Sequence, residues 1–141
     1  MKKIFAALFA LLCVPANAQA PAGLNPGNYI SASATAADTS SSTLTLGDST
    51  HFTYVCGFDV SGLGATSTAA STVTIGPLTT TTGGNVNMGF GYVFASGVTA
   101  PNTPLLVTFV PCIPVSGVAT LTVPGAAGNT STTLSMWGYK Q

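Results

Sequence analysis

Large apolar side chains recur at every second position along much of the chain from residue 51 onward, and this spacing constrains the fold more than any other feature. A period of two places these side chains on one face of an extended strand, whereas an amphipathic helix needs a period of 3.6 residues. Because no convincing helical spacing appears beyond the N-terminal segment, we predict an all-β domain. The alternation predicts a core formed by Phe52, Tyr54, Phe58, Val60, Val86, Met88, Phe90, Tyr92, Phe94, Leu105, Val107 and Phe109.

Turn signals separate these runs and indicate where the strands end. Ser61-Gly62 and Ser116-Gly117 favour turns, Gly83-Gly84 favours a hairpin, and Pro111 is expected to stop the strand that starts near Leu105. Roughly six clear strands with one or two weaker ones suit a two-sheet antiparallel sandwich. Periodicity alone leaves open whether this sandwich is jelly-roll or immunoglobulin-like.

The first 18 residues have the layout of a secretory signal peptide. Lys2 and Lys3 precede an almost wholly apolar stretch, and Ala16-Asn17-Ala18 matches the small-residue pattern at which signal peptides are cleaved. The apolar stretch is shorter than the roughly 20 residues that a membrane-spanning helix needs, and no later segment meets that requirement. A lipidated Cys13 is the alternative, but Leu12 is larger than the residue that normally precedes such a cysteine. We therefore expect a secreted protein, in the periplasm, outside the cell or on the cell surface.

Residues 19–50 and 51–141 differ in composition, and we predict that they form an extended arm and the β-sandwich domain, respectively. The arm is rich in Ser, Thr and Ala, and its only plausible apolar anchors are Tyr29-Ile30 and Leu44–Leu46. So few large side chains cannot build a separate core, and ordering the arm therefore requires that it dock elsewhere. We expect it to add as an edge strand either to its own sandwich or to that of a neighbouring copy.

Cys56 and Cys112 are the cysteines that remain once the signal peptide is removed. An even number of cysteines in an oxidising compartment predicts a disulfide between them. The chain-entropy model assigns about 4 kcal/mol of stabilisation to the long loop that this bridge would close. A metal-binding or redox-active pair is disfavoured, because C-x-x-C spacing is absent and His51 is the only other soft ligand.

Charged residues make up 4% of the chain, which contains no arginine and no glutamate. Most catalysis depends on clustered acids, bases and cations, so we expect neither an enzyme nor a cofactor or metal site. Without a basic patch, nucleic-acid binding is not expected either. His51 and Asp59 share a strand face but lie roughly 26 Å apart, too far for a catalytic pair. Asp48 is near enough to reach His51 through a turn, and a loop aspartate that accepts backbone hydrogen bonds is its expected role.

Trp137 and Tyr139 are the candidate interface residues, since they share one face of the last predicted strand. Exposed aromatics in this pattern can stack on sugars or anchor a partner, and the alternative is that they form a second core layer or cap the sandwich. The strand faces carry Ser and Thr but almost none of the lysines that discourage edge pairing, which favours self-association or contact with a surface polymer. Asn129-Thr130-Ser131 also matches a glycosylation acceptor.

Several short segments at turns and strand ends are similar to those of a known group of proteins. They are residues 56–66, Thr103-Pro104-Leu105, Phe109-Val110-Pro111, Gly128-Asn129-Thr130 and Trp137-Gly138-Tyr139. Together they resemble small Thr-, Ala- and Gly-rich β-sandwich proteins of unassigned function found among phage and prophage-like gene products of bacteria. The resemblance implies a structural or surface role and carries over no catalytic residue, and the secretory signal favours an exported relative. A second similarity, to chaperone–usher pilins, rests on the signal peptide, the single disulfide, the chain length and the aromatic Tyr139.

These observations lead to two functional hypotheses. The first is an exported, non-catalytic structural or interaction protein, a surface or particle subunit that assembles through β-edges or its N-terminal arm. The alternative is a binding module for a neutral glycan or polymer that uses Trp137 and Tyr139. Neither hypothesis requires a cofactor or, after signal removal, a membrane span.

Overall fold

The computed structural model describes residues 28–36, 39–79 and 84–141. The predicted signal peptide, Cys13, Asp38 and the predicted turn at Gly83 lie outside these residues. Within them, eight strands and no α-helix are present, which confirms the prediction of an all-β fold. The strands are β1 (Tyr29–Ala36), β2 (Ser42–Leu46), β3 (Phe52–Gly62), β4 (Ala69–Thr79), β5 (Asn85–Phe94), β6 (Leu105–Ser116), β7 (Ala119–Val123) and β8 (Thr132–Lys140).

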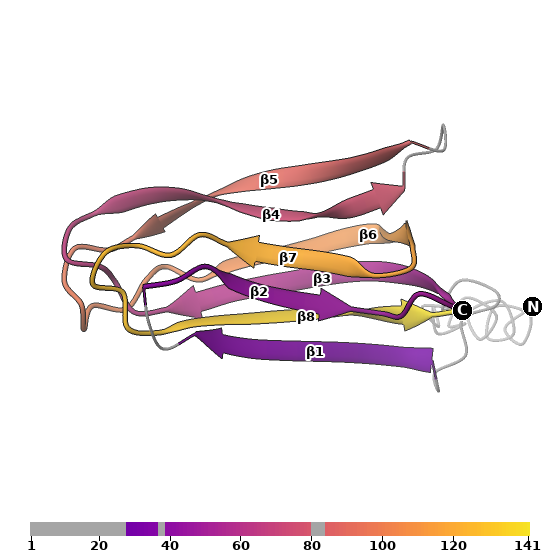
Figure 1. Cartoon of the computed structure of the whole chain (residues 1–141), viewed down its shortest axis with the longest axis horizontal. Helices are drawn as coiled ribbons and strands as arrows, with labels where there is room; N and C mark the ends of the chain where they lie inside the picture. Colours follow the sequence, from indigo (N-terminus) through magenta and orange to yellow (C-terminus); the bar gives the residue numbers. More distant parts are fainter. Residues whose placement is uncertain (1–27, 37–38, 80–83) are drawn as a thin grey trace, which may run out of the picture.

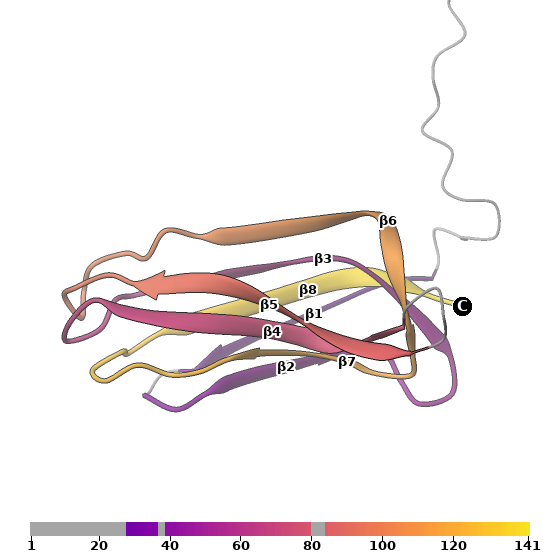
Figure 2. The same cartoon turned by 90° about the horizontal axis from the view of Figure 1, so that it is seen from above.

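The strands form two four-stranded sheets that face each other as the layers of a sandwich (Figures 1 and 2). Sheet A has the order β1-β8-β3-β6, sheet B has the order β2-β7-β4-β5, and all pairs are antiparallel. Four of the strand pairs are nested: the first strand pairs with the last, the second with the seventh, and so on inward to the connection between β4 and β5. Successive pairs in this series, which are β1–β8, β2–β7, β3–β6 and β4–β5, belong alternately to sheet A and sheet B. This order is that of a jelly roll, so the strand order decides the choice that the sequence left open.

The segment that was predicted to be an arm supplies one edge strand to each sheet of the same chain. All eight residues of β1 pair with β8, from Tyr29 opposite Tyr139 to Ala36 opposite Thr132. β2 pairs with β7 over its five residues, and its Leu44 is buried in the core. The arm therefore docks on its own sandwich in this structure.

A bulge in β3 reverses which residues of this strand face the core. Thr53 and Val55 are fully buried before the bulge, and Phe58 and Val60 are fully buried after it. Inward positions thus change from odd-numbered to even-numbered where the register with both neighbouring strands shifts, just before Gly57. A bulge has this effect because one additional residue moves every later side chain to the opposite face.

The prediction that Phe52 and Tyr54 belong to the core is therefore wrong. Both lie on the outer face of sheet A, where Phe52 is 59% exposed and Tyr54 is half-buried. Phe58 and Val60, which follow the bulge, are in the core as predicted.

Val86 and Met88 also lie outside the predicted core, with exposed fractions of 45% and 37%. They are at the beginning of β5, the edge strand of sheet B, where no further strand of that sheet shields them. Farther along β5, Tyr92 and Phe94 are buried as predicted, and Phe90 packs against the core.

The core between the sheets joins residues from all eight strands. The rings of Phe58, Phe90 and Phe109 connect β3, β5 and β6, with centroids 5.2, 6.3 and 6.5 Å apart. Leu105 and Val107 pack against this core from β6 and remain partly exposed, because β6 is the edge strand of sheet A.

Strand β6 continues through Pro111, so the prediction that this proline ends the strand is wrong. An edge strand tolerates proline, since the side without a neighbour needs no amide donor. Residues 109–112 form an irregular stretch opposite Cys56, and Figure 2 shows β6 turning sharply within its length. Val110 in this stretch is 94% exposed.

Candidate binding surface on the outer face of sheet A

The last strand places both candidate interface residues on the outside of sheet A. Along β8, Leu134 and Met136 are fully buried between the sheets, whereas Trp137 and Tyr139 alternate with them and are half-buried. The two aromatic side chains therefore belong to the outer face and not to the core between the sheets.

Trp137 lies across the neighbouring strand β3 at Gly57. The two residues are directly opposite each other in the β3–β8 pair, and a Cβ atom at position 57 would collide with atoms Cζ2 and Cε2 of the indole ring. The ring can occupy this place only because glycine has no side chain. The indole thus reaches over the backbone of β3 and remains partly open to solvent, in agreement with its half-buried state.

A row of tyrosines crosses the same face next to Trp137. Tyr139 of β8 lies opposite Tyr29 of β1 on one side and opposite Tyr54 of β3 on the other. The ring centroids of Tyr29 and Tyr139 are 5.8 Å apart and their planes are inclined at 79°. Since the two rings are nearly perpendicular, only one of them can lie along the sheet, and the pair forms a corner instead of a flat platform.

Most of the side chains on the other sides of the indole are polar. The row of residues that crosses the sheet at Trp137 ends in two hydroxyl side chains. Ser31 of β1 lies opposite Trp137, and Thr108 of β6 lies opposite Gly57. The next row along β3 contains Asp59, which lies opposite Ser135. No hydrogen bond or ion pair joins the Asp59 carboxylate to another described residue. The aromatic surface is therefore bordered by hydroxyl groups, by the Asp59 carboxylate, and by the exposed side chain of Leu106, which lies opposite Asp59 on β6.

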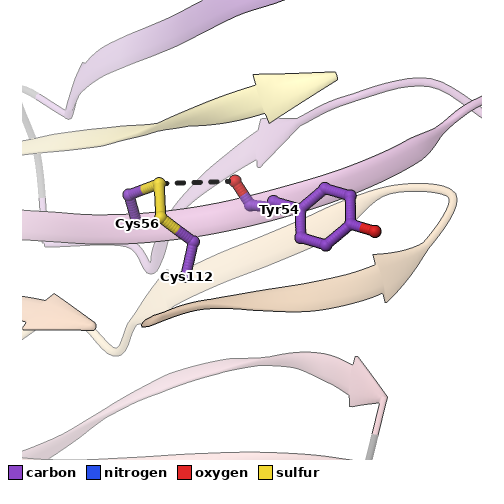
Figure 3. The surroundings of a disulfide bond; sticks show 3 residues. All are labelled: Tyr54, Cys56 and Cys112. Atoms are coloured by element: carbon purple, nitrogen blue, oxygen red, sulfur yellow. Dashed lines mark hydrogen bonds between the residues drawn. A yellow bond between two sulfur atoms is a disulfide. The ribbon is translucent and has the colours of Figure 1, made fainter. Parts of the chain in front are cut away.

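The disulfide Cys56–Cys112 fixes the border of this surface between β3 and β6, as predicted from the sequence (Figure 3). The two Cα atoms are 4.2 Å apart, and the bridge spans 56 positions of the sequence. The Sγ atom of Cys56 approaches the carbonyl oxygen of Tyr54 to 3.9 Å. A disulfide sulfur has no proton to donate, so this approach is a packing contact.

The other charged side chains that the structure describes gather at the end of the sandwich where β8 finishes. Oδ1 of Asp48 is 2.8 Å from Nδ1 of His51, and Oδ2 accepts a hydrogen bond of 2.9 Å from Nζ of Lys140. The ammonium group of Lys140, followed by His51 and Thr50, lowers the pKa of Asp48 well below its ordinary range. Asp48 also accepts the backbone hydrogen bond of Thr50 at 2.9 Å, which is the loop role that the sequence predicted.

This cluster does not have the geometry of a catalytic relay. The hydroxyl of Thr50 lies 2.8 Å from Nδ1 of His51, the same nitrogen that approaches Asp48. A relay requires the acid on one ring nitrogen and the nucleophile on the other. Asp59, the other partner considered for His51, lies in the Trp137 surface instead.

Two buried asparagines, which the sequence analysis missed as structural residues, organise the loops at the opposite end. Asn102 and Asn129 both donate to the carbonyl oxygen of Leu63, over 2.7 and 2.6 Å, and Asn129 also accepts from Thr132 at 2.9 Å. Asn129 is 1% exposed, so the predicted glycosylation acceptor is inaccessible in the folded protein. A buried side-chain amide must be hydrogen-bonded, but sequence alone gives no sign of which asparagines are buried.

Other kinds of site are not found in the part of the chain that the structure describes. No three His, Cys, Asp or Glu side chains come together there as ligands for a metal ion. Nor does that part contain a helix of the length and apolarity needed to cross a membrane. No family model, no curated protein sequence and no solved structure matches this chain.

Proposed function

We propose that the chain is an exported, non-catalytic structural protein that assembles with copies of itself through the free edge of β1. The observation that carries this proposal is the composition of that edge: Tyr29–Ala36 contains no charge, proline or glycine, and it pairs with β8 in an unbroken register. Among the described residues no strand pairs with its other side. Unpaired backbone groups along such a strand are a template for a further strand.

The other three sheet edges have features that discourage pairing. β2 has only five residues, and β6 contains Pro111, Pro114 and the irregular stretch opposite Cys56. β5 includes Gly89 and Gly91, which are poor strand formers, and its pairing with β4 is interrupted. Short strands, prolines and irregularities are the usual means by which proteins protect a sheet edge. Only β1 lacks all of them.

Export is part of the proposal. The disulfide supports an oxidising compartment outside the cytoplasm, and the predicted signal peptide supports secretion. A self-assembling surface or particle subunit also agrees with the resemblance to phage-like sandwich proteins, which stays a prediction.

The test is the oligomeric state of the exported protein, measured by size-exclusion chromatography with light scattering across a range of concentrations. We expect dimers or larger assemblies in the wild type and monomers in Ser33→Lys. Ser33 is exposed at the middle of β1, and an antiparallel pair of two β1 strands would bring the two lysines together, where like charges are destabilising. Thr43→Lys is the matched control on the short edge strand β2 and should remain assembled. A wild type that stays monomeric at the highest concentration would contradict the proposal.

A further inference from the structure

We infer that Trp137 and Asp59 form a binding site for a pyranose ring of a neutral glycan on the outer face of sheet A. The inference does not rest on assembly through β1, since it concerns the face of the sheet and not its edge. Two features carry it: an indole whose atoms Cζ2 and Cε2 lie over Gly57, and a nearby carboxylate that has no partner among the described residues.

The indole supplies the stacking surface. Atoms Cζ2 and Cε2 of the Trp137 ring lie over the backbone of β3 at Gly57, and the residue is only half-buried, so part of the ring remains open to a ligand. An apolar, aromatic body of this kind contacts a ligand ring through dispersion interactions. The C–H groups of a pyranose present a flat apolar patch that matches such a ring.

Asp59 supplies the polar recognition. It lies two residues from Gly57 on the same outer face of β3, about 6.6 Å along the strand, so its carboxylate stands at the border of the indole. A carboxylate accepts hydrogen bonds with both oxygens, and two adjacent hydroxyl groups of a sugar can donate to both at once. Ser31 and Thr108 border the other sides of the ring and can add further hydrogen bonds.

Charge selects a neutral sugar over other ligands. Asp59 would repel acidic saccharides and phosphates, and none of the described cationic side chains shares its part of the face. Covering the face with a second copy of the chain would bury Asp59 without a counter-ion, because Lys140 is already paired with Asp48 at 2.9 Å. An unpaired buried charge is strongly unfavourable. Hydroxyl groups satisfy the carboxylate without removing all of its water.

The corner formed by Tyr29 and Tyr139 extends the site along the sheet. Tyr139 follows Trp137 on the same face of β8, and the exposed ring of Tyr29 stands nearly perpendicular to it. When one sugar of an oligosaccharide is stacked on Trp137, the next sugar along the sheet would therefore contact the tyrosine pair. This arrangement favours an oligosaccharide over a single sugar.

The fluorescence of Trp137 measures binding directly, because the chain has a single tryptophan. The exported protein is titrated with neutral hexaoses of β-linked glucose, β-linked mannose and α-linked glucose, and with a hexaose of galacturonic acid as the acidic counterpart. We expect a saturating change with at least one neutral hexaose and none with the acidic one. Calorimetry with the same saccharides gives a signal that does not depend on the indole.

Two variants and a matched control locate the site. Asp59→Asn should weaken binding of the neutral hexaose at least tenfold and keep the fluorophore, and Trp137→Ala should abolish the calorimetric signal. Asp48→Asn removes a carboxylate from the other end of the sandwich and should bind as the wild type does. Thermal unfolding of each variant shows that it is folded before binding is compared.

Three results would overturn the inference. The first is the absence of any fluorescence or calorimetric response to all three neutral hexaoses at 10 mM. The second is equal binding by Asp59→Asn and the wild type. The third is a change in Trp137 fluorescence that follows protein concentration and not saccharide, which would mean that a second copy covers this face. Each proposal can fail by itself, because Ser33→Lys tests assembly through β1 and Asp59→Asn tests saccharide binding. A Ser33→Lys variant that is monomeric and binds the hexaose as the wild type does would support both.

Discussion

The indole of Trp137 occupies the space that a side chain at Gly57 would need, although the two residues come from strands far apart in sequence. The contact couples the last strand of the chain to the bulged strand β3 on the outer face of sheet A. It sets the position of the largest aromatic ring in the proposed sugar site.

Replacing Gly57 with alanine should therefore destabilise the protein. The new methyl group would collide with the indole and with the backbone carbonyl oxygen of Val107, and overpacking of this kind costs about 1–3 kcal/mol. Denaturant unfolding measures the loss, and the emission of Trp137 should shift to longer wavelength as the ring becomes more exposed. Gly91→Ala is the control, because nothing lies within 4 Å of a Cβ atom at that position. Because the methyl group also meets the carbonyl oxygen of Val107, the emission reports on the ring more directly than the stability does, and unchanged emission in Gly57→Ala would show that the ring does not depend on the glycine.

Loss of the disulfide should weaken the fold substantially. The bridge closes a loop of 56 positions, for which the chain-entropy model gives about 4 kcal/mol. We expect the double variant Cys56→Ala/Cys112→Ala to lose an amount of this order in urea unfolding. Mass spectrometry of exported wild-type protein should detect two additional hydrogens after reduction. Two free thiols in non-reduced protein would show that the bridge is absent in solution.

The bulge in β3 predicts opposite outcomes for two phenylalanines of one strand. Phe58 is fully buried, so Phe58→Ala should cost about 3–5 kcal/mol through lost contacts and a cavity. Phe52 is 59% exposed, and Phe52→Ala should change stability by less than about 1 kcal/mol. Comparison of the two unfolding curves tests the register directly. A larger loss of stability in Phe52→Ala than in Phe58→Ala would show that the bulge lies elsewhere in the strand.

The contacts of Asp48 should make stability depend on acid pH. Its pKa is lowered in the folded protein, mainly by Lys140, from an ordinary value of 3.8. A lowered pKa stabilises the folded state above the ordinary value, and this contribution disappears as the pH falls through the lower folded value. Asp48→Asn should therefore reduce the melting temperature slightly at pH 7 and match the wild type in strong acid. Because Asp48 is solvent-exposed, high salt should also diminish the difference. A difference that grows below pH 4 would contradict this account.

The alternation of apolar residues was sufficient to predict the sandwich, but it could not reveal the bulge. Phe52, Tyr54, Phe58 and Val60 read as one uninterrupted face in the sequence, and the structure divides them between two faces. The only local sign is Gly57 in the middle of a strand, which is typical of a bulge or a close backbone approach. Here it marks both.

The first two strands were underestimated for a related reason. β1 has small inward side chains such as Ala32 and Ala34, which give little apolar signal. Small residues suffice there because β1 is an edge strand that covers only the margin of the core. The position of Trp137 over Gly57 depends on the pairing of β3 with β8, and no short-range pattern contains that information.

The nested strand order also determines when the protein can finish folding. β4 and β5 are the only partners that follow one another among the described strands, and every other pair joins more distant parts of the chain. Folds dominated by such non-local pairs have high contact order and fold slowly. β1 in particular has to wait for β8, so it remains without its partner until residues 132–140 have been synthesised. Sheet A can therefore be completed only after β8, the most distant of its four strands from β1 in the sequence, has been synthesised.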